Sequence, residues 1–155
     1  MLNAFRMLGK LSGDWVEATS DHALSIETIL KHGVRDEPDV NVVATRDEKG
    51  FSVLVWNYHD DDVQEGAADV ALTIVGVKPG ACRLAHFRMD ETHSNAFAEW
   101  KKMGSPQAVT GADYERLEAA GRLEAIENKA LASDGALTLS THLPRQGVSL
   151  FRVDY

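Results

Sequence analysis

The sequence HFRMDETHSNAFAEWKKMGSP, residues 86–106, decides the fold because two backbone periodicities meet in it. Leading into it, apolar and polar residues alternate along residues 81–89, as in a β-strand with one buried face. Within it, Ala96, Trp100 and Met103 recur at helical spacing, and the Gly-Ser-Pro sequence that follows ends that helix. The stretch therefore predicts a strand that passes into a short helix.

Similar patterns elsewhere predict further strands. Residues 40–45 and 51–58 are rich in β-branched and aromatic side chains, and the polar turn between them ends at Gly50, which is typical of a β-hairpin. Residues 24–30 are expected to form a turn-rich connection, and residues 123–131 are compatible with either a helix or a strand. The remaining strands are expected at 70–74, 81–89, 137–141 and 148–153, with a short one at 15–18.

Two more helices are predicted. Thr110 and Asp113 have the spacing of a capping box, which starts a helix that runs to about Arg122. Near the N-terminus, apolar residues recur at every third position and form one side of an amphipathic helix. These residues are Leu2, Phe5, Leu8 and Leu11. Gly13 ends this first helix, and its apolar side needs a partner to cover it.

Together these elements predict a mainly β fold: an antiparallel β-sandwich with a short N-terminal helix and a small α-helical insertion at about residues 92–123. Strands that follow one another at short intervals separated by turns are typical of sandwiches and not of parallel α/β sheets. A length of 155 residues fits one domain, or one domain with a small appendage.

Composition narrows the classes of partner. The net charge of −8 argues against a nucleic-acid or anionic-membrane surface, because either needs clustered Lys and Arg. No stretch approaches the roughly 20 apolar residues of a membrane span, and the N-terminus lacks the pattern of a signal peptide. We therefore expect no nucleic-acid partner, no membrane partner and a cytoplasmic location. A periplasmic or secreted location is the alternative if a signal lies upstream.

Motifs for metal, cofactor or nucleophilic chemistry are absent from the sequence. The six histidines form no pair at metal-ligand spacing, and there is no GxSxG elbow or Gly-rich phosphate loop. The three aspartates at 60–62 lack the regular spacing of a calcium loop, so a solvated turn is expected there. The one cysteine, Cys82, is expected to be a small buried apolar residue. We assign no catalytic, cofactor-binding or metal-binding residue.

Two aromatic pairs can be read either as a ligand platform or as a packing face. Phe97 and Trp100 lie three residues apart on one helix face, and Trp56 and Tyr58 lie on one face of a strand. Helical spacing favours packing of the first pair against the sandwich or a neighbouring domain. The second pair is expected in the core.

Three segments carry a resemblance to a known family. They are residues 86–107 (HFRMDETHSNAFAEWKKMGSPQ), 53–62 (VLVWNYHDDD) and 143–154 (LPRQGVSLFRVD). Together they resemble the C-terminal portion of bacterial β-xylosidases of glycoside hydrolase family 39. The segment NAFRMLGKL, residues 3–11, resembles the last helix of that family's catalytic barrel. The match follows the family's order along nearly the whole chain.

The resemblance implies an enzyme that cleaves terminal β-xylosides with retention, as in xylan degradation. Its (β/α)8 barrel would be followed by a β-sandwich with a helical insertion. The family's two catalytic glutamates lie on barrel strands before the matched region, so neither has a counterpart here. The implied division is a barrel-helix remnant at residues 1–13 and a non-catalytic accessory β-sandwich at residues 14–155. A complete barrel takes roughly 250 residues, so the chain is expected to lack it.

The implied partners follow from that division. The first is the missing catalytic barrel, against which the apolar side of the N-terminal helix would pack. Without the barrel, this helix would expose its apolar side, fold back on the sandwich or join a second copy of the chain. The alternative function is a stand-alone carbohydrate-binding or oligomerisation module, for which a xylo-oligosaccharide would be the ligand. No cofactor is implied.

Overall fold

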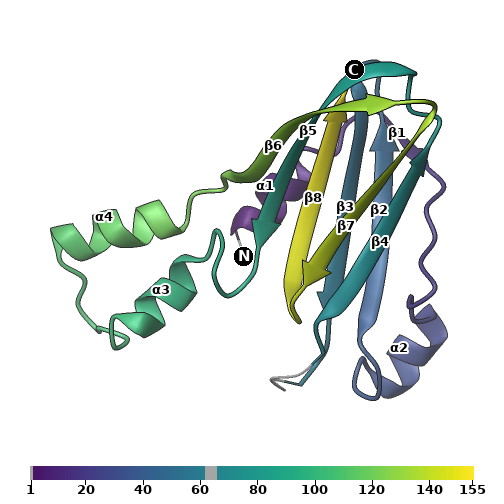
Figure 1. Cartoon of the computed structure of the whole chain (residues 1–155). Coiled ribbons are helices and arrows are strands. Elements are labelled where there is room, and N and C mark those ends of the chain that lie inside the picture. The colour runs from purple at the N-terminus through teal and green to yellow at the C-terminus, as the bar shows by residue number, and fades with distance from the viewer. Residues whose placement is uncertain (1, 62–65) are drawn as a thin grey trace.

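The computed structural model describes residues 2–61 and 66–155 (Figure 1). Its helices are α1 (Leu2–Leu8), α2 (Ile26–His32), α3 (Ala96–Lys102) and α4 (Gly111–Ala120). Its strands are β1 (Asp14–Val16), β2 (Asp39–Arg46), β3 (Gly50–Tyr58), β4 (Ala68–Val75), β5 (Gly80–Met89), β6 (Ala125–Ser133), β7 (Ala136–Leu143) and β8 (Gly147–Asp154). None of the described helices is long and apolar enough to cross a membrane.

The strands form two antiparallel sheets. The larger has the order β1-β2-β3-β8-β5-β6, and the smaller pairs β4 with β7. Figure 1 shows β4 and β7 lying across the larger sheet. The mainly β, sandwich-like prediction is therefore confirmed. The six or seven strands expected from sequence become eight among the described residues.

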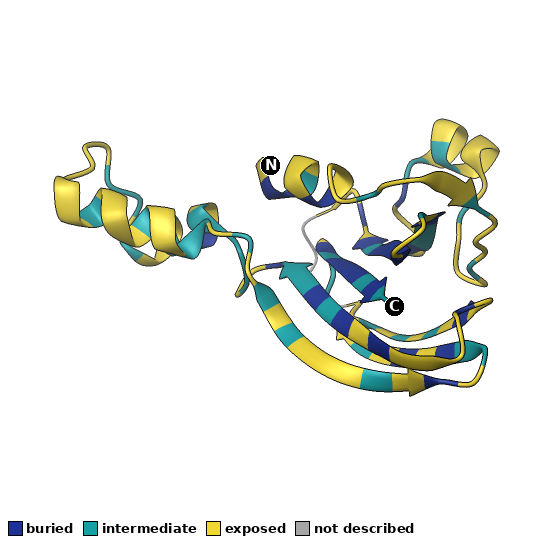
Figure 2. Cartoon of the chain, turned by 90° about the horizontal axis from the view of Figure 1, so that it is seen from above, coloured by how far each residue is buried: buried dark blue, intermediate teal, exposed yellow. Residues whose placement is uncertain are grey.

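The main core lies between the two sheets. Alternation along each strand turns one set of apolar side chains inward, where they interdigitate. This buried set is Ala44, Phe51, Val53, Val55, Ile74, Val77, Cys82, Leu84, Leu137, Leu139, Leu143, Phe151 and Val153. The expectation for Cys82 is confirmed, since it is a free and buried thiol. Figure 2 shows the burial concentrated on the sandwich, while the far helices remain exposed.

A second, smaller core lies on the opposite face of the larger sheet, beneath α1. Met7 is fully buried there against Leu54 of β3 and Leu150 of β8, and partly buried side chains surround them. The face of α1 that packs on the sheet therefore carries Met7 and the buried Asn3. Of the regular apolar side predicted from sequence, Leu2, Phe5 and Leu8 turn outward and are exposed, whereas Leu11, which follows α1, packs against this core.

A polar cluster fixes the connection between α1 and the sandwich. Asp47, in the β2–β3 turn, accepts hydrogen bonds from Ser12 and from Arg152 of β8. The Arg152 guanidinium, with help from Ser12, holds the pKa of Asp47 well below its usual range. Gly13 has φ of 84°, and a Cβ there would lie 2.1 Å from the Arg46 carbonyl oxygen. Only glycine fits this backbone approach.

Two segments differ from the sequence-based expectation. The supposed turn-rich connection contains α2, which Ser25 caps through a hydrogen bond from the Thr28 amide. Its apolar Ile26 and Leu30 are exposed, so the helix lacks the buried stripe that usually reveals one. The ambiguous segment at 123–131 resolves into β6, which pairs along most of β5. The β2–β3 hairpin and the capping box of α4 form as predicted.

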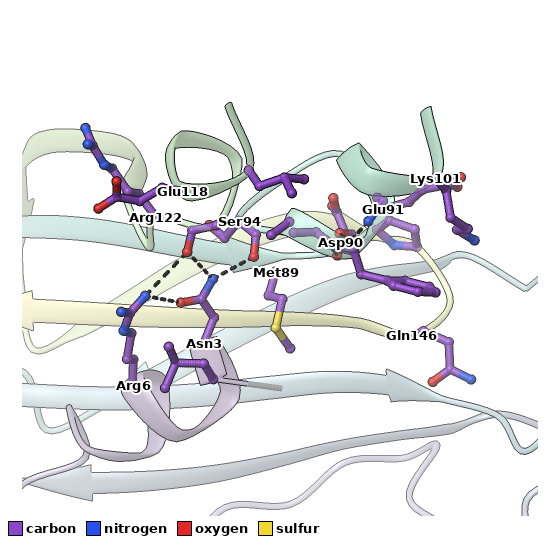
Figure 3. Close-up of a pocket in the computed structure, with 18 of the residues that line it drawn as sticks. Asn3, Arg6, Met89, Asp90, Glu91, Ser94, Lys101, Glu118, Arg122 and Gln146 are labelled. Carbon is purple, nitrogen blue, oxygen red and sulfur yellow. Dashed lines mark hydrogen bonds between the residues drawn. The ribbon is translucent and has the colours of Figure 1, made fainter. Parts of the chain in front are cut away.

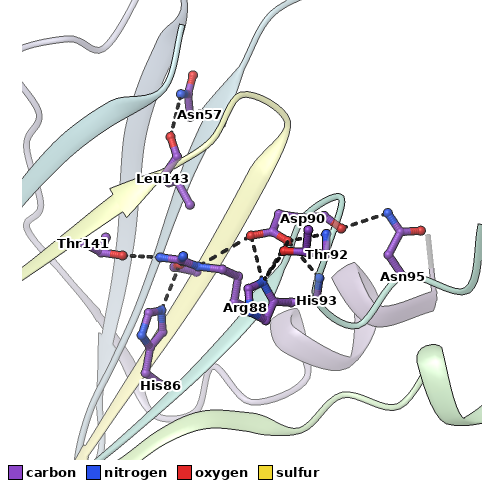
Figure 4. A network of polar contacts seen from close by, with 10 residues as sticks. Asn57, His86, Arg88, Asp90, Thr92, His93, Asn95, Thr141 and Leu143 are labelled. Carbon is purple, nitrogen blue, oxygen red and sulfur yellow. Dashed lines mark hydrogen bonds and ion pairs between the residues drawn. The ribbon is translucent and has the colours of Figure 1, made fainter. Parts of the chain in front are cut away.

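A buried polar network joins the two sheets near one end of the sandwich (Figure 4). Arg88 of β5 donates to Thr141 of β7, which links the larger sheet to the smaller. His86 lies 3.0 Å from the Ser149 hydroxyl and stacks on Phe151 with 4.2 Å between ring centroids. Burial, with the nearby Arg88 charge adding to it, lowers the pKa of His86 from 6.5 to about 4. His86 is therefore neutral at pH 7.

The lowered pKa of His86 predicts that the folded chain loses stability in acid at pH values above those at which carboxylates titrate. Below pH 6.5 the unfolded chain binds a proton at His86, whereas the folded chain does not until about pH 4. Stability is therefore lost as the pH falls through this window. We expect the free energy of unfolding, measured with urea, to fall by roughly 2 kcal/mol between pH 7 and pH 5. A His86→Gln variant should lose most of this dependence, and an unchanged slope in that variant would contradict the assignment.

Candidate functional site: a cleft beside a helical arm

The most prominent feature outside the sandwich is a helical arm, residues 95–121, which contains α3 and α4. It leaves the sandwich after β5 and returns before β6, and Figures 1 and 2 show it extending away from both sheets. Inside the arm, Arg116 of α4 pairs with Glu99 of α3, and Ala98 is buried. The arm is thus a helical pair with little core of its own.

A cleft of about 1390 Å³ opens between the arm, α1, the end of β5 and the turn between β7 and β8 (Figure 3). Exposed Phe97 and Tyr114 of the arm and Leu2 of α1 give its walls an apolar part. Basic side chains, among them Lys101 and Arg122, share the lining with acidic ones. The cleft therefore offers both apolar and polar contacts and is our candidate functional site.

Asp90 organises the base of the arm. Its Oδ1 accepts hydrogen bonds from the Thr92 amide and hydroxyl, the His93 amide and the His93 ring, all between 2.8 and 3.0 Å. Its backbone carbonyl accepts from the Asn95 side chain, which also caps α3. Burial alone would raise the pKa of Asp90, but the hydrogen bonds from Thr92 and His93 outweigh it and lower the pKa.

The histidine and aromatics of residues 86–106 do not converge on a ligand site. Phe97 and Trp100 stack on each other, with centroids 5.6 Å apart and planes at 25°. The Trp100 indole also donates to the Pro106 carbonyl. Phe97 is 61% exposed, and neither ring joins a core cluster of the sandwich. Packing of this pair on the sandwich, the first alternative predicted, is therefore wrong, because the arm projects away from the sandwich; packing against a neighbouring domain stays a prediction.

The second aromatic pair also differs from expectation. Tyr58 is exposed, and Trp56, whose indole donates to Asp39, is only partly buried. Neither belongs to a core. With Leu8 of α1 and Val148 of β8 they line an apolar hollow of about 340 Å³ on the face of the larger sheet that carries α1. This hollow continues the outward apolar side of α1.

The acidic residues of the cleft have identifiable structural roles or lie in solvent. Asp90 is engaged by the donors described above, and Glu91 is exposed. Within the described residues, no group of three or more His, Cys, Asp or Glu side chains is arranged to hold a metal ion. Asp60, in the aspartate run, accepts from the Val34 amide, and Asp62 lies outside the described residues.

One site residue could not be found from sequence. Asn3 is 5% exposed and donates to two backbone carbonyls of the arm's base, those of Ser94 and Gly121. These partners are 91 and 118 residues away in the chain. No local pattern signals such contacts, because they depend on how α1 docks on the sheet.

Comparison with known proteins gives a consistent result. The model of the family described as "Glycosyl hydrolases family 39" matches residues 1–138. A monomeric β-xylosidase from Caulobacter crescentus is similar in structure, with a TM-score of 0.74 and 19% identity over 98% of this chain. The family 39 enzyme from Xanthomonas axonopodis pv. citri gives 0.76 and 17% over 98% of this chain. A bacterial orthologue of human α-L-iduronidase gives 0.76 and 20% over 99%.

The matched structures are much longer than this chain. The chain spans 30% of the Caulobacter enzyme, 29% of the Xanthomonas enzyme and 26% of the iduronidase orthologue. Nearly all of this chain is therefore matched by a minor part of each larger protein.

The hydrogen bonds around Asp90 predict a marked effect of its removal. Asp90 is buried, so an Asp90→Ala variant leaves the Thr92 and His93 donors without their acceptor. We expect the free energy of unfolding in urea at pH 7 to fall by about 1–3 kcal/mol. The matched control is Glu91→Gln, which changes an exposed neighbouring acid and should leave stability within about 0.5 kcal/mol. Equal effects of the two variants would contradict the role given to Asp90.

Proposed function

The chain belongs to glycosyl hydrolase family 39, and we propose that it is the non-catalytic accessory domain of a β-xylosidase-like enzyme of this family. The observation that carries the proposal is the pattern of coverage. The chain is matched over 98% of its length by the Caulobacter β-xylosidase, yet it spans only 30% of that protein. In this proposal the remaining part supplies a (β/α)8 barrel that cleaves terminal β-xylosides with retention.

The outward side of α1 supplies the docking surface in this proposal. Leu2, Phe5 and Leu8 are between 47% and 65% exposed. Leu8 also lines the apolar hollow that contains Trp56 and Tyr58. Contiguous exposed apolar surface of this kind is characteristic of an interface. Residues 1–13 would then be the last helix of the barrel, and residues 14–155 the accessory domain that supports it.

The proposed role also accounts for the state of the carboxylates. Retaining glycosidases need two carboxyl groups about 5–5.5 Å apart, facing a sugar-sized pocket. In the cleft, Asp90 is committed to the base of the arm. Asp113 of α4, which does not line the cleft, is committed to its capping box with Thr110. The hydrogen bonds from Thr110 lower the pKa of Asp113, which suits a structural carboxylate and not a general acid.

The enzymatic test uses the isolated 155-residue chain with an aryl β-xyloside. We expect release of the aryl group at the buffer rate, because the chain has no assigned nucleophile or general acid. The Caulobacter β-xylosidase serves as the positive control under the same conditions. Turnover above background that disappears when Glu91 or Glu118 is changed to Gln would overturn the proposal, since both line the cleft.

The alternative of a stand-alone carbohydrate-binding module has one observation in its favour, the exposure of Phe97 and Tyr114 in the cleft. Sugar platforms present open, coplanar rings, whereas one face of Phe97 is covered by Trp100 and Lys101 lies over the ring at 5.1 Å. We therefore expect calorimetric titration with xylose or xylobiose to give no heat above dilution. Saturable heat that is lost in a Phe97→Ala variant would favour the binding module instead.

A further inference from the structure

We propose that α1 is a clamp that sets the position of the helical arm relative to the sandwich, with Asn3 as its positioning residue. The proposal concerns the folded chain itself and does not depend on the accessory function. It rests on one short helix that contacts the larger sheet and both ends of the arm. The sheet contact and the arm contact come from the same face of that helix.

The first half of the clamp is the anchor on the sheet. Met7 is fully buried against Leu54 and Leu150, on the central strands β3 and β8. Leu123, which follows the arm, packs against the same cluster. The Lys10 carbonyl accepts from Ser52, so the turn that follows α1 is also held to β3. α1 is therefore fixed to the most central part of the sandwich.

The second half of the clamp is the pair of hydrogen bonds from Asn3 to the arm, which Figure 3 shows. Asn3 lies one helical turn before Met7 and shares its face. Its Nδ2 donates to the Ser94 carbonyl at 2.6 Å and to the Gly121 carbonyl at 2.9 Å. Ser94 precedes the cap of α3, and Gly121 follows α4. One amide group thus joins the two points at which the chain enters and leaves the arm.

Arg6 fixes the orientation of that amide. Its Nη1 donates to Asn3 Oδ1 at 2.9 Å, which leaves the Nδ2 group to face the two carbonyls. The same nitrogen lies 3.4 Å from the Gly121 carbonyl oxygen. Since a guanidinium has no acceptor, the Asn3 side chain can adopt only one of its two flipped orientations here.

The base of the arm is tightly packed where Asn3 binds it. A Cβ added at Gly121 would lie 3.2 Å from Ala96 Cβ, so the two crossing segments are in near contact. Ser94 has φ of 52°, an uncommon backbone conformation for a residue other than glycine. Asn3 closes this junction by donating to two backbone carbonyls, those of Ser94 and Gly121, at a partly buried position. Without Asn3, the longer contact of Arg6 with the Gly121 carbonyl oxygen, at 3.4 Å, would be the remaining side-chain hydrogen bond described here between α1 and the arm.

The clamp has a consequence for the cleft. Leu2 on one wall and Phe97 and Tyr114 on the other keep their separation only while α1 and the arm are joined. The outward side of α1 remains free for a partner while its inward side holds the arm. A partner that docks on α1 would thereby also fix the arm.

The test measures the distance between the arm and the sandwich in the isolated chain. Spin labels are placed at exposed Glu115 of α4 and exposed Thr73 of β4, in a Cys82→Ala background that removes the native thiol. We expect a narrow distance distribution in the otherwise unchanged chain. In Asn3→Ala the distribution should broaden by about twofold, because the junction loses its buried hydrogen bonds.

Two further variants make the result specific. Asn3→Asp keeps the size of the side chain but lacks both N–H donors, so it should broaden the distribution as much as Asn3→Ala does. Phe5→Ala changes the exposed side of the same helix and should leave the distribution narrow. Circular dichroism of each variant verifies that the sandwich is folded. If an Asn3 variant does not fold, Arg6→Ala is measured in its place. Narrow distributions in the Asn3 and Arg6 variants, or equal broadening in Phe5→Ala, would overturn the proposal.

Discussion

The pairing of β8 between β3 and β5 is the constraint on which the rest of the structure depends. This last strand completes the larger sheet, and it contributes to both cores, with Phe151 facing β4–β7 and Leu150 facing α1. Within the larger sheet, the strands that precede β8 in the chain form two antiparallel groups, β1-β2-β3 and β5-β6, and β8 is the strand that joins them. Each group alone would leave an apolar face and a backbone edge unpaired. The sandwich, the surface on which α1 packs and the base of the arm therefore all depend on the pairing of β8.

Features determined by neighbouring residues could be predicted from the sequence. The β2–β3 hairpin follows from a polar turn with glycine between two β-rich runs, and α4 begins at the Thr110–Asp113 capping box. Features determined by distant contacts could not. The alternation of β6 is weak, and only pairing with β5 selects a strand over a helix. α2 exposes Ile26 and Leu30, so it lacks the amphipathic pattern on which helix prediction depends.

The candidate site was less predictable than the fold for the same reason. The stretch that contains Phe97 and Trp100 passes from strand to helix as its sequence predicts, yet its aromatics pack on each other and not on the sandwich. In α1 the sequence drew attention to the regular apolar positions, whereas the residues that hold the structure together are Asn3 and Met7. Asn3 binds carbonyls that lie 91 and 118 positions away in the chain. A local pattern of three or four residues cannot indicate such contacts.

The place of the arm in the topology has a consequence for how such proteins can diverge. β5 and β6 are antiparallel neighbours, paired from Gly80 with Ser133 to Phe87 with Ala125, so the whole arm lies within the connecting loop of one hairpin. The ends of that loop are brought together by the strands, whatever lies between them. Lengthening a loop adds little closure entropy. The arm is therefore the segment in which insertions, deletions and exchanged sequences can accumulate over evolution while both cores stay unchanged, and it is the natural position at which to graft a new binding element onto this sandwich.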